Sequence, residues 1–294
     1  MQIEIVEPSG YCAGVARAMQ LAKQTREKFP NDSIVVLGML VHNQDALKEL
    51  DQLNIKTIYN SKLSLLEMVD EIPNNSIVIL TAHGHDKKVE QKLNEKGLKF
   101  IDATCFYVTQ SDELIRKAIN EGRDVFYLGK KGHPEAEAAL SISEKVHLIS
   151  NNQTFEELKN NKIQTSKPLF VSQTTFSLEE MDTAIKNLSK IYKDIEIAKG
   201  VCNASSLRQE GIKKISSNVD MIIVVGGLNS NNTKTLVKVA KETHPNCKVI
   251  QVENSNDIKK GDLAGHQYIA IASGASTPNF IVKEVTNEIK LLCD

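Results

Sequence analysis

Three cysteines stand in similar local settings, each in a run of small residues before a helix-like segment. They are Cys12, Cys105 and Cys202, which lie 93 and 97 residues apart in a chain of 294 residues. Three thiolates that meet repel one another unless a cation lies between them, and zinc and iron–sulfur clusters are the centres that thiolates favour. A four-iron cluster with three cysteine ligands keeps one iron open to a substrate, unlike the fully ligated clusters of electron transfer. The residues alone leave both metals open.

The two remaining cysteines, Cys247 and Cys293, have no counterpart at this spacing, so we interpret them as packing residues. Five cysteines without a secretory signal disfavour disulfides, and no apolar run approaches the ~20 residues that span a bilayer. We therefore expect a cytoplasmic protein without a membrane partner. A net charge of −1 gives no general reason to expect nucleic acid, so an anionic ligand must bind at a local site.

Hydrogen-bond donors recur where apolar runs end. His42, His133 and Ser230 each stand four residues after the glycine that ends such a run, and His83 follows another run. These side chains, with backbone N–H groups at helix N-termini, suit phosphate oxygens, which accept several hydrogen bonds. A diphosphate would explain the number of donors. The predicted lining consists of His42, His83, His133, Thr174, Ser230, Asn232 and Ser276.

Glu135 follows His133 and Pro134, and the proline places this carboxylate in the first turn of a helix. Such a carboxylate can simply interact with the helix dipole. It can instead donate a proton if it lies inside the pocket, where burial and anionic neighbours raise its pKa. Glu137, two residues on, should face another direction.

The elements that must position these residues repeat three times. In each third, a helix-like pattern follows the cysteine, then an apolar run that ends in glycine, another helix-like stretch, and a second apolar run that ends in a small polar loop. The first runs occupy 33–38, 125–129 and 221–226, and the second runs occupy 77–80, 168–171 and 268–271. Apolar runs of this length, alternating with helices, predict an α/β fold with buried parallel strands and right-handed crossovers.

We expect three similar units around a pseudo-threefold axis. The predicted units are 14–101, 102–197 and 198–294, and a strand before the next cysteine closes each of the first two. The last unit has no such strand downstream, so the N-terminal strand 2–6 should complete it and bring residues 1–13 into it. Ligands bind beyond the carboxyl ends of parallel strands, so the loops of the three units are expected to converge on one central pocket.

Eight short motifs occur in one order along the chain and together closely resemble the family of 4-hydroxy-3-methylbut-2-enyl diphosphate reductases. These are iron–sulfur enzymes of the methylerythritol phosphate route to isoprenoids. The motifs are the run 10–15 around Cys12, Val41-His42-Asn43, Ala82-His83-Gly84, Asp102-Ala103-Thr104-Cys105, Gly132-His133-Pro134-Glu135, Gln173-Thr174-Thr175, Asn229-Ser230-Asn231-Asn232 and Gly274-Ala275-Ser276. Each motif is weak alone, and their shared order makes the resemblance specific.

The resemblance implies a trefoil of three α/β domains around a central [4Fe–4S] cluster held by Cys12, Cys105 and Cys202. It implies that Glu135 delivers protons, that Thr174 positions the substrate hydroxyl, and that His133 also takes part in catalysis. The implied substrate-binding residues are His42, His83, His133, Thr174, Ser230, Asn231, Asn232 and Ser276. Of these, the resemblance implies that His42, His83, His133, Ser230, Asn232 and Ser276 hold the diphosphate. Two positions depart from the family pattern. Asn231 stands where many members have serine, and Phe106 stands where many have proline.

The implied reaction is a reductive dehydroxylation that takes two electrons and protons, releases water and gives isopentenyl and dimethylallyl diphosphates. A ferredoxin or a flavodoxin would supply the electrons. The residues alone also allow a zinc-dependent hydrolase or lyase that acts on a phosphorylated metabolite through three thiolate ligands, or a carrier protein without catalysis.

Overall fold

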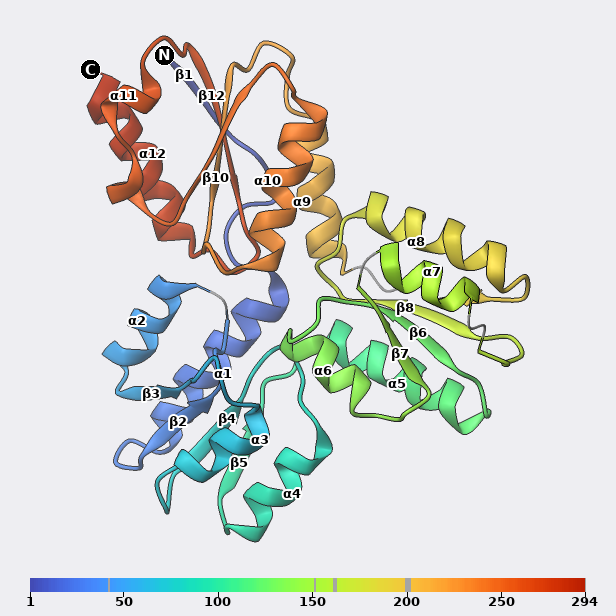
Figure 1. Ribbon diagram of the computed structural model, residues 1–294. Helices are drawn as coiled ribbons and strands as arrows, with labels where there is room; N and C mark the ends of the chain where they lie inside the picture. Colours follow the sequence, from blue (N-terminus) through green and yellow to red (C-terminus); the bar gives the residue numbers. More distant parts are fainter. Residues whose placement is uncertain (42, 151, 161–162, 199–201, 294) are drawn as a thin grey trace. The chain divides into compact units, whose positions relative to one another are not determined.

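The computed structural model describes residues 1–41, 43–150, 152–160, 163–198 and 202–293 (Figure 1). Within these ranges the chain forms three sheets of four strands each, with helices between the strands. All paired strands in the three sheets are parallel. The predicted α/β class with small parallel sheets is therefore confirmed.

The strands follow one order in all three sheets. The first sheet contains β3 (Ile55–Ile58), β2 (Ile34–Leu37), β4 (Ile77–Leu80) and β5 (Lys99–Asp102). The second contains β7 (Val146–Ile149), β6 (Val125–Leu128), β8 (Leu169–Ser172) and β9 (Glu196–Ile197). The third contains β11 (Lys248–Val252), β10 (Met221–Val225), β12 (Tyr268–Ser273) and β1 (Gln2–Ile5).

Helices occupy most of the connections. The first half of the chain contains α1 (Ala13–Lys28), α2 (Gln44–Gln52), α3 (Leu65–Met68), the 3₁₀ turn η1 (Val69–Glu71), α4 (Lys87–Glu95), α5 (Phe106–Asn120) and α6 (Pro134–Leu140). The second half contains α7 (Asn152–Asn160), α8 (Leu178–Ile191), α9 (Asn203–Lys213), α10 (Asn231–Thr243), the 3₁₀ turn η2 (Ser255–Asp257), α11 (Lys260–Leu263) and α12 (Asn279–Cys293). A helix begins directly after each of the three candidate ligands Cys12, Cys105 and Cys202, as expected.

The two middle strands of each sheet are mostly apolar and buried, because helices cover both faces. In β10, Ile223 packs with α12, whereas Ile222 packs with α9 and α10 on the other face. In β6, Phe126 packs with α7 and α8, whereas Tyr127 packs with α5 and α6. Burying one large apolar side chain in this way stabilises a fold by about 1.5–3 kcal/mol. These strands match the apolar runs found in the sequence.

The N-terminal strand pairs with the last strand of the chain. Gln2 lies opposite Tyr268 and Ile5 lies opposite Ile271, in parallel register. Figure 1 shows β1, in dark blue, beside β12, in red. This is the pairing predicted for the spare strand at the N-terminus.

The chain divides into two compact lobes of unequal size. The smaller lobe contains Met1–Ala16, Val41–Leu50 and Asn203–Asp294, and it holds the third sheet. The larger lobe contains Arg17–Leu40 and Asp51–Cys202, and it holds the first and second sheets. The boundaries of the three sequence units stay a prediction.

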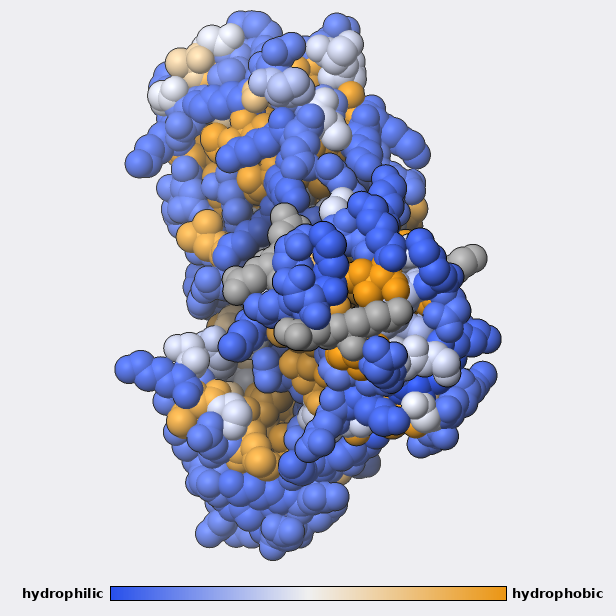
Figure 2. Space-filling view, turned by 45° about the vertical axis from the view of Figure 1, so that its right-hand side comes forward, coloured by the Kyte–Doolittle hydropathy of each residue, from blue (hydrophilic) through white to orange (hydrophobic). Residues whose placement is uncertain are grey.

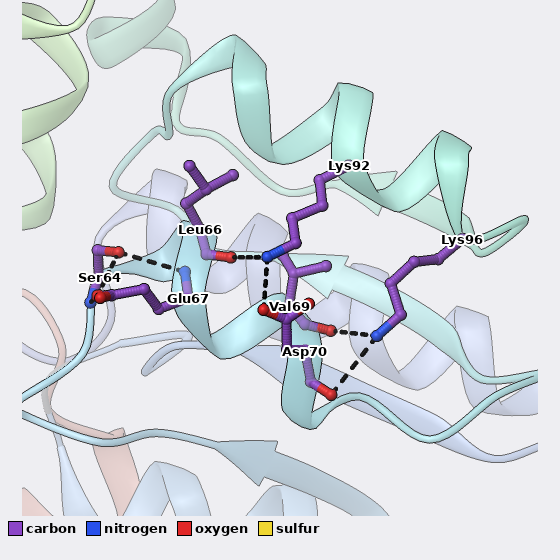
Figure 3. A network of polar contacts seen from close by, with 7 residues as sticks. All are labelled: Ser64, Leu66, Glu67, Val69, Asp70, Lys92 and Lys96. Carbon is purple, nitrogen blue, oxygen red and sulfur yellow. Dashed lines mark hydrogen bonds and ion pairs between the residues drawn. The ribbon is translucent and has the colours of Figure 1, made fainter.

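A polar network fixes the short helix α3 and the η1 turn onto α4 (Figure 3). The ammonium of Lys92 donates to the carbonyl of Leu66 at 3.1 Å, and that of Lys96 donates to the carbonyl of Val69 at 2.9 Å. Carbonyls near the end of a short helix have no intrahelical partner, so lysines from a neighbouring helix satisfy them. The network anchors this connection on the first sheet.

Hydrophilic side chains predominate on the face drawn in Figure 2, with hydrophobic ones in separate groups among them. Of the helices that the structure describes, none is long and apolar enough to cross a bilayer.

Candidate active site

Cys12 is fixed by the loop that follows β12. Its backbone N–H donates to the carbonyl of Ala275 at 2.9 Å, and the N–H of Gly10 donates to Ser273 Oγ at 2.9 Å. Gly10 has a φ of +77°, and a Cβ there would overlap the side chain of Asn279, so the turn before the cysteine requires glycine. Cys12 is thereby held next to the loop that carries Ser276.

Cys105 is held in the same way in the first sheet. Its backbone N–H donates to the carbonyl of Ala82 at 3.0 Å. Ala82 lies two residues after the end of β4, as Ala275 lies two residues after the end of β12. The repeated sequence pattern therefore corresponds to a repeated contact, in which a strand-end loop fixes the amide of a cysteine.

The start of α10, beside the third sheet, carries Ser230, Asn231 and Asn232. Ser230 caps α10, because its Oγ accepts from the N–H of Thr233 at 3.3 Å. Asn232 accepts from the N–H of Ala275 at 2.8 Å and donates to Ser205 Oγ at 3.0 Å. Asn231 is the first residue of α10. Asn232 thus ties α9, α10 and the loop after β12 together and keeps one amide hydrogen to donate.

Two predicted histidines lie together in the larger lobe. The rings of His83 and His133 meet edge to face with 5.6 Å between their centroids. His133 caps α6, and its Nδ1 accepts from the N–H of Glu135 at 3.2 Å. In the neutral ring the proton must then lie on Nε2, so His133 presents a donor away from the helix. His42 falls outside the described residues.

Glu135 is buried, with 4% of its surface exposed, although it lies in the first turn of α6. Its Oε1 accepts from the N–H of Thr174 at 2.8 Å, and its Oε2 lies 2.9 Å from Thr174 Oγ1. The hydroxyl of Tyr127 lies 3.4 Å from Oε1. Glu137 instead accepts from the N–H of Gly132 at 2.9 Å and is exposed. The Glu135 carboxyl is therefore buried, as a proton donor requires, and its place inside a pocket stays a prediction.

Burial raises the pKa of Glu135 from 4.5 to about 7. The two hydrogen bonds from Thr174 lower this pKa, the charge of Asp112 raises it, and the hydroxyl of Tyr127 lowers it. Burial also raises the pKa of Asp112 to about 6, against the charges of Arg116 and His85. Near neutral pH, Glu135 is therefore divided between acid and carboxylate, as suits a group that donates protons.

The chemistry of the three thiols fits an iron–sulfur centre. Cys12, Cys105 and Cys202 form no disulfide, are half-buried, and each directly precedes a helix. The N–H of Val15 points at Cys12 Sγ at 3.4 Å. Cys247 differs, since its thiol donates to the carbonyl of Val219 at 2.9 Å and burial raises its pKa.

The structure does not test the ligation itself. No group of three His, Cys, Asp or Glu side chains that could hold a metal ion occurs within 1–41, 43–150, 152–160, 163–198 and 202–293. The predicted residues fall into two sets. Cys12, Ser230, Asn231, Asn232 and Ser276 lie in the smaller lobe, and His83, Cys105, His133, Glu135, Thr174 and Cys202 lie in the larger lobe. A single pocket formed by both sets stays a prediction.

Sequence reasoning missed Tyr127 and Asp112. Tyr127 belongs to an apolar run, and a tyrosine in a buried strand needs a partner for its hydroxyl, which is a signal that could have been used. Asp112 stands between the buried residues Val108 and Ile115 at helical spacing, which also marks the inner face of α5.

The raised pKa of Glu135 predicts a stability that falls as pH rises. Between about pH 4.5 and 7 the folded protein keeps a proton that the unfolded chain has lost, so folding becomes less favourable with increasing pH. In E135Q this contribution to the decline should disappear. The free energy of urea unfolding of E135Q relative to wild type should rise by about 3 kcal/mol between pH 5 and 8. E137Q serves as control, and an equal pH dependence in all three proteins would contradict the shift.

Known proteins resemble this chain over nearly its whole length. The family model described as LytB protein matches residues 3–290. A relative from Malacoplasma penetrans, named 4-hydroxy-3-methylbut-2-enyl diphosphate reductase, is 36% identical over 291 residues, which cover 97% of this chain and 96% of the relative. A relative of the same name from Bacillus cytotoxicus is 38% identical over 288 residues, which cover 97% of this chain and 89% of the relative.

Two solved structures share the fold. The structure of the E-1-hydroxy-2-methyl-but-2-enyl-4-diphosphate reductase from Plasmodium falciparum matches with a TM-score of 0.87 and 26% identity, over 97% of this chain and 87% of that one. A structure of (E)-4-hydroxy-3-methyl-but-2-enyl diphosphate reductase, described as the terminal enzyme of the non-mevalonate pathway, matches with a TM-score of 0.70 and 31% identity, over 99% of both chains.

Proposed function

Because this chain belongs to the LytB protein family, we propose that it reduces 4-hydroxy-3-methylbut-2-enyl diphosphate to isopentenyl and dimethylallyl diphosphates. Family membership makes the chain an oxidoreductase. In the proposed reaction two electrons and two protons replace the C–O bond of the substrate hydroxyl with a C–H bond and release water. Isoprenoid biosynthesis would then be the pathway that uses its products.

The buried pair of Glu135 and Thr174 is the observation that carries this proposal. Reductive loss of a hydroxyl consumes protons, and Glu135 has a pKa of about 7, so it can hold a proton at neutral pH and release it. The Thr174 hydroxyl lies 2.9 Å from Glu135 Oε2, so a proton can pass between these two groups. Thr174 would position the hydroxyl of the substrate, and His133 would present Nε2–H beside it.

The donor side chains support a diphosphate as the anionic group of the substrate. His83, His133, Ser230, Asn232 and Ser276 all lie in loops or first helical turns at the carboxyl ends of strands. Diphosphate oxygens accept several hydrogen bonds, and the start of α10 adds backbone N–H groups. We assign the diphosphate to these side chains, together with His42, Thr174 and the start of α10 at Asn231.

Cys12, Cys105 and Cys202 would hold a [4Fe–4S] cluster. When bound, such a cluster supplies single electrons and an open iron for the substrate oxygen. The residues of the chain bind and orient the substrate around it and supply the protons. A ferredoxin or a flavodoxin is the proposed electron donor, and the cytoplasm is the proposed compartment.

The zinc-dependent alternative is not favoured, because the relatives are named as reductases. A hydrolase or lyase needs no external electrons, whereas a reductase does. A carrier without catalysis is likewise disfavoured, because the relatives are named as enzymes.

Protein purified or reconstituted without oxygen should contain iron and acid-labile sulfide and should be brown. With a reduced flavodoxin or a chemical one-electron donor, it should convert the hydroxylated diphosphate to the two five-carbon diphosphates. Zinc in stoichiometric amount without sulfide, or a colourless protein after anaerobic reconstitution, would overturn the proposal.

A further inference from the structure

Tyr127 brings a single hydroxyl into an otherwise apolar layer. It is the third residue of β6, it is 1% exposed, and its ring packs among the side chains of α5 and α6. Burial raises the pKa of this phenol well above 10, so the group stays protonated and can only donate or accept as a neutral hydroxyl. A buried tyrosine of this kind needs a polar partner, and the partner here is Glu135.

The ring of Tyr127 is held in place by its neighbours. A Cβ at Gly129 would lie 2.7 Å from Cε1 of Tyr127 and 3.1 Å from the Cβ of Ala136. The glycine after β6 therefore leaves the space in which the ring lies against α6. This packing fixes the direction in which the hydroxyl points.

The contacts of Glu135 distinguish its two carboxyl oxygens. Oε1 accepts from the N–H of Thr174 at 2.8 Å and lies 3.4 Å from the Tyr127 hydroxyl. Oε2 has the Thr174 hydroxyl at 2.9 Å. A backbone N–H can only donate, so Oε1 must act as an acceptor, and a proton on the carboxyl is favoured on Oε2.

We propose that Tyr127 is a positioning residue for Glu135: with the Thr174 amide, its hydroxyl holds Oε1 as an acceptor, so that Oε2 carries the proton and exchanges it with the Thr174 hydroxyl. The protonated Oε2 donates to Thr174 Oγ1, and the hydrogen of the Thr174 hydroxyl then points away from Glu135 toward the ligand. When that hydrogen is transferred, the proton of Oε2 moves to Oγ1 and leaves a carboxylate. The hydroxyl of Tyr127 stabilises this carboxylate through Oε1.

Among the described residues, three groups act on the Glu135 carboxyl. They are Tyr127 from β6, Asp112 from α5, and Thr174 from the loop after β8. Tyr127 and Asp112 act in opposite directions. The hydroxyl of Tyr127 lowers the pKa of Glu135, and the charge of Asp112 raises it. Their removal should therefore move the proton equilibrium of Glu135 in opposite directions.

The test is a titration of the Glu135 carboxyl in purified protein, by carbon NMR of labelled glutamate or by infrared difference spectroscopy, with E135Q to assign the signal. Y127F removes one hydroxyl and should raise the pKa of Glu135 by about 0.5–1. D112N should lower it. Y192F is the matched control, because Tyr192 is a second buried tyrosine of the larger lobe and lies in the apolar cluster on the opposite face of β6.

The kinetic readout rests on the proposed function. Y127F should lower kcat by about three- to tenfold with little change in KM, and it should move the alkaline decline of kcat to higher pH. D112N should move that decline to lower pH. A purely structural role for Tyr127 would instead reduce thermal stability and leave the titration and pH profile unchanged.

The role of Tyr127 and the proposed reductase function are tested independently of each other. The titration needs neither substrate nor a cluster, so it decides the role of Tyr127 even if the protein proves to catalyse another reaction. A pKa of Glu135 in Y127F equal to those in wild type and Y192F, with D112N shifted as expected, would overturn the inference. If Y127F does not fold, Gly129→Ala provides a second variant, because the added Cβ displaces the ring while the hydroxyl is kept. It should raise the pKa of Glu135 in the same direction, and an unchanged pKa there would overturn the inference too.

Discussion

E135Q should lower the rate of reduction by about 10²–10⁴-fold while the affinity for the diphosphate substrate changes little. Glutamine has nearly the shape of glutamic acid and can keep both contacts to Thr174, since its carbonyl accepts from the amide and its NH₂ reaches the hydroxyl. The glutamine cannot release a proton, so only the proton-transfer step should become slower. Steady-state kinetics under anaerobic conditions, together with calorimetric binding of the substrate, separate the two effects.

E137Q is the matched control for this experiment. Glu137 lies on the same helix two residues later, is exposed, and contacts the N–H of Gly132. E137Q likewise replaces one carboxyl group of α6 by an amide, without touching the buried pair. Activity of E135Q within a few-fold of wild type would assign proton delivery to another group, whereas equal losses in both variants would indicate a general effect of charge.

Serine at Cys12, Cys105 or Cys202 should reduce the iron and sulfide content sharply and leave activity below detection. A serine hydroxyl does not ionise near neutral pH and is a poor ligand for iron–sulfur clusters, so each replacement removes one of three proposed ligands. Iron and sulfide analysis, visible absorption and activity of each variant, purified without oxygen, check this expectation.

Cys247 provides the control for the cysteine series. Its thiol donates to the carbonyl of Val219, which a serine hydroxyl can also do, and its raised pKa keeps it a thiol rather than a thiolate. The double variant C247S/C293S should retain full cluster content. Loss of the cluster in this variant, or its retention in C105S, would show that the ligands have been assigned wrongly.

Most of the fold that positions the site could be predicted from the sequence, because the central strands are buried on both faces. The strands β2, β4 and β10 are continuous apolar runs, so each can be recognised as a buried strand from its own residues. The outer strands β3, β7 and β11 were not predicted. In β3 only Ile55 is fully buried, and its central residues are lysine and threonine, so its strand conformation depends on pairing with β2.

The site could be predicted only partly, because several of its contacts depend on how elements distant in the sequence pack together. The three cysteines recur 93 and 97 residues apart, and the donors stand after apolar runs, so their spacing marked them as candidates. The contact between Glu135 and Thr174 joins residues 39 positions apart, and no local pattern marks it. Whether Glu135 faces water or the interior depends on how α6 packs on β6, which periodicity alone does not give. The hydroxyl of Tyr127 is therefore visible as a partner only once the fold is known.

The pairing of β1 with β12 has a consequence for the newly made chain. Gln2 is synthesised before its partner Tyr268, which lies 266 positions later in the chain. The hydrogen bond from the amide of Cys12 to the carbonyl of Ala275 likewise cannot form until Ala275 has been synthesised. Until then β1 lacks the strand with which it pairs, and unpaired strands are prone to pair with other chains. A chain that ends before β12 lacks both this pairing and the contact that fixes the amide of Cys12.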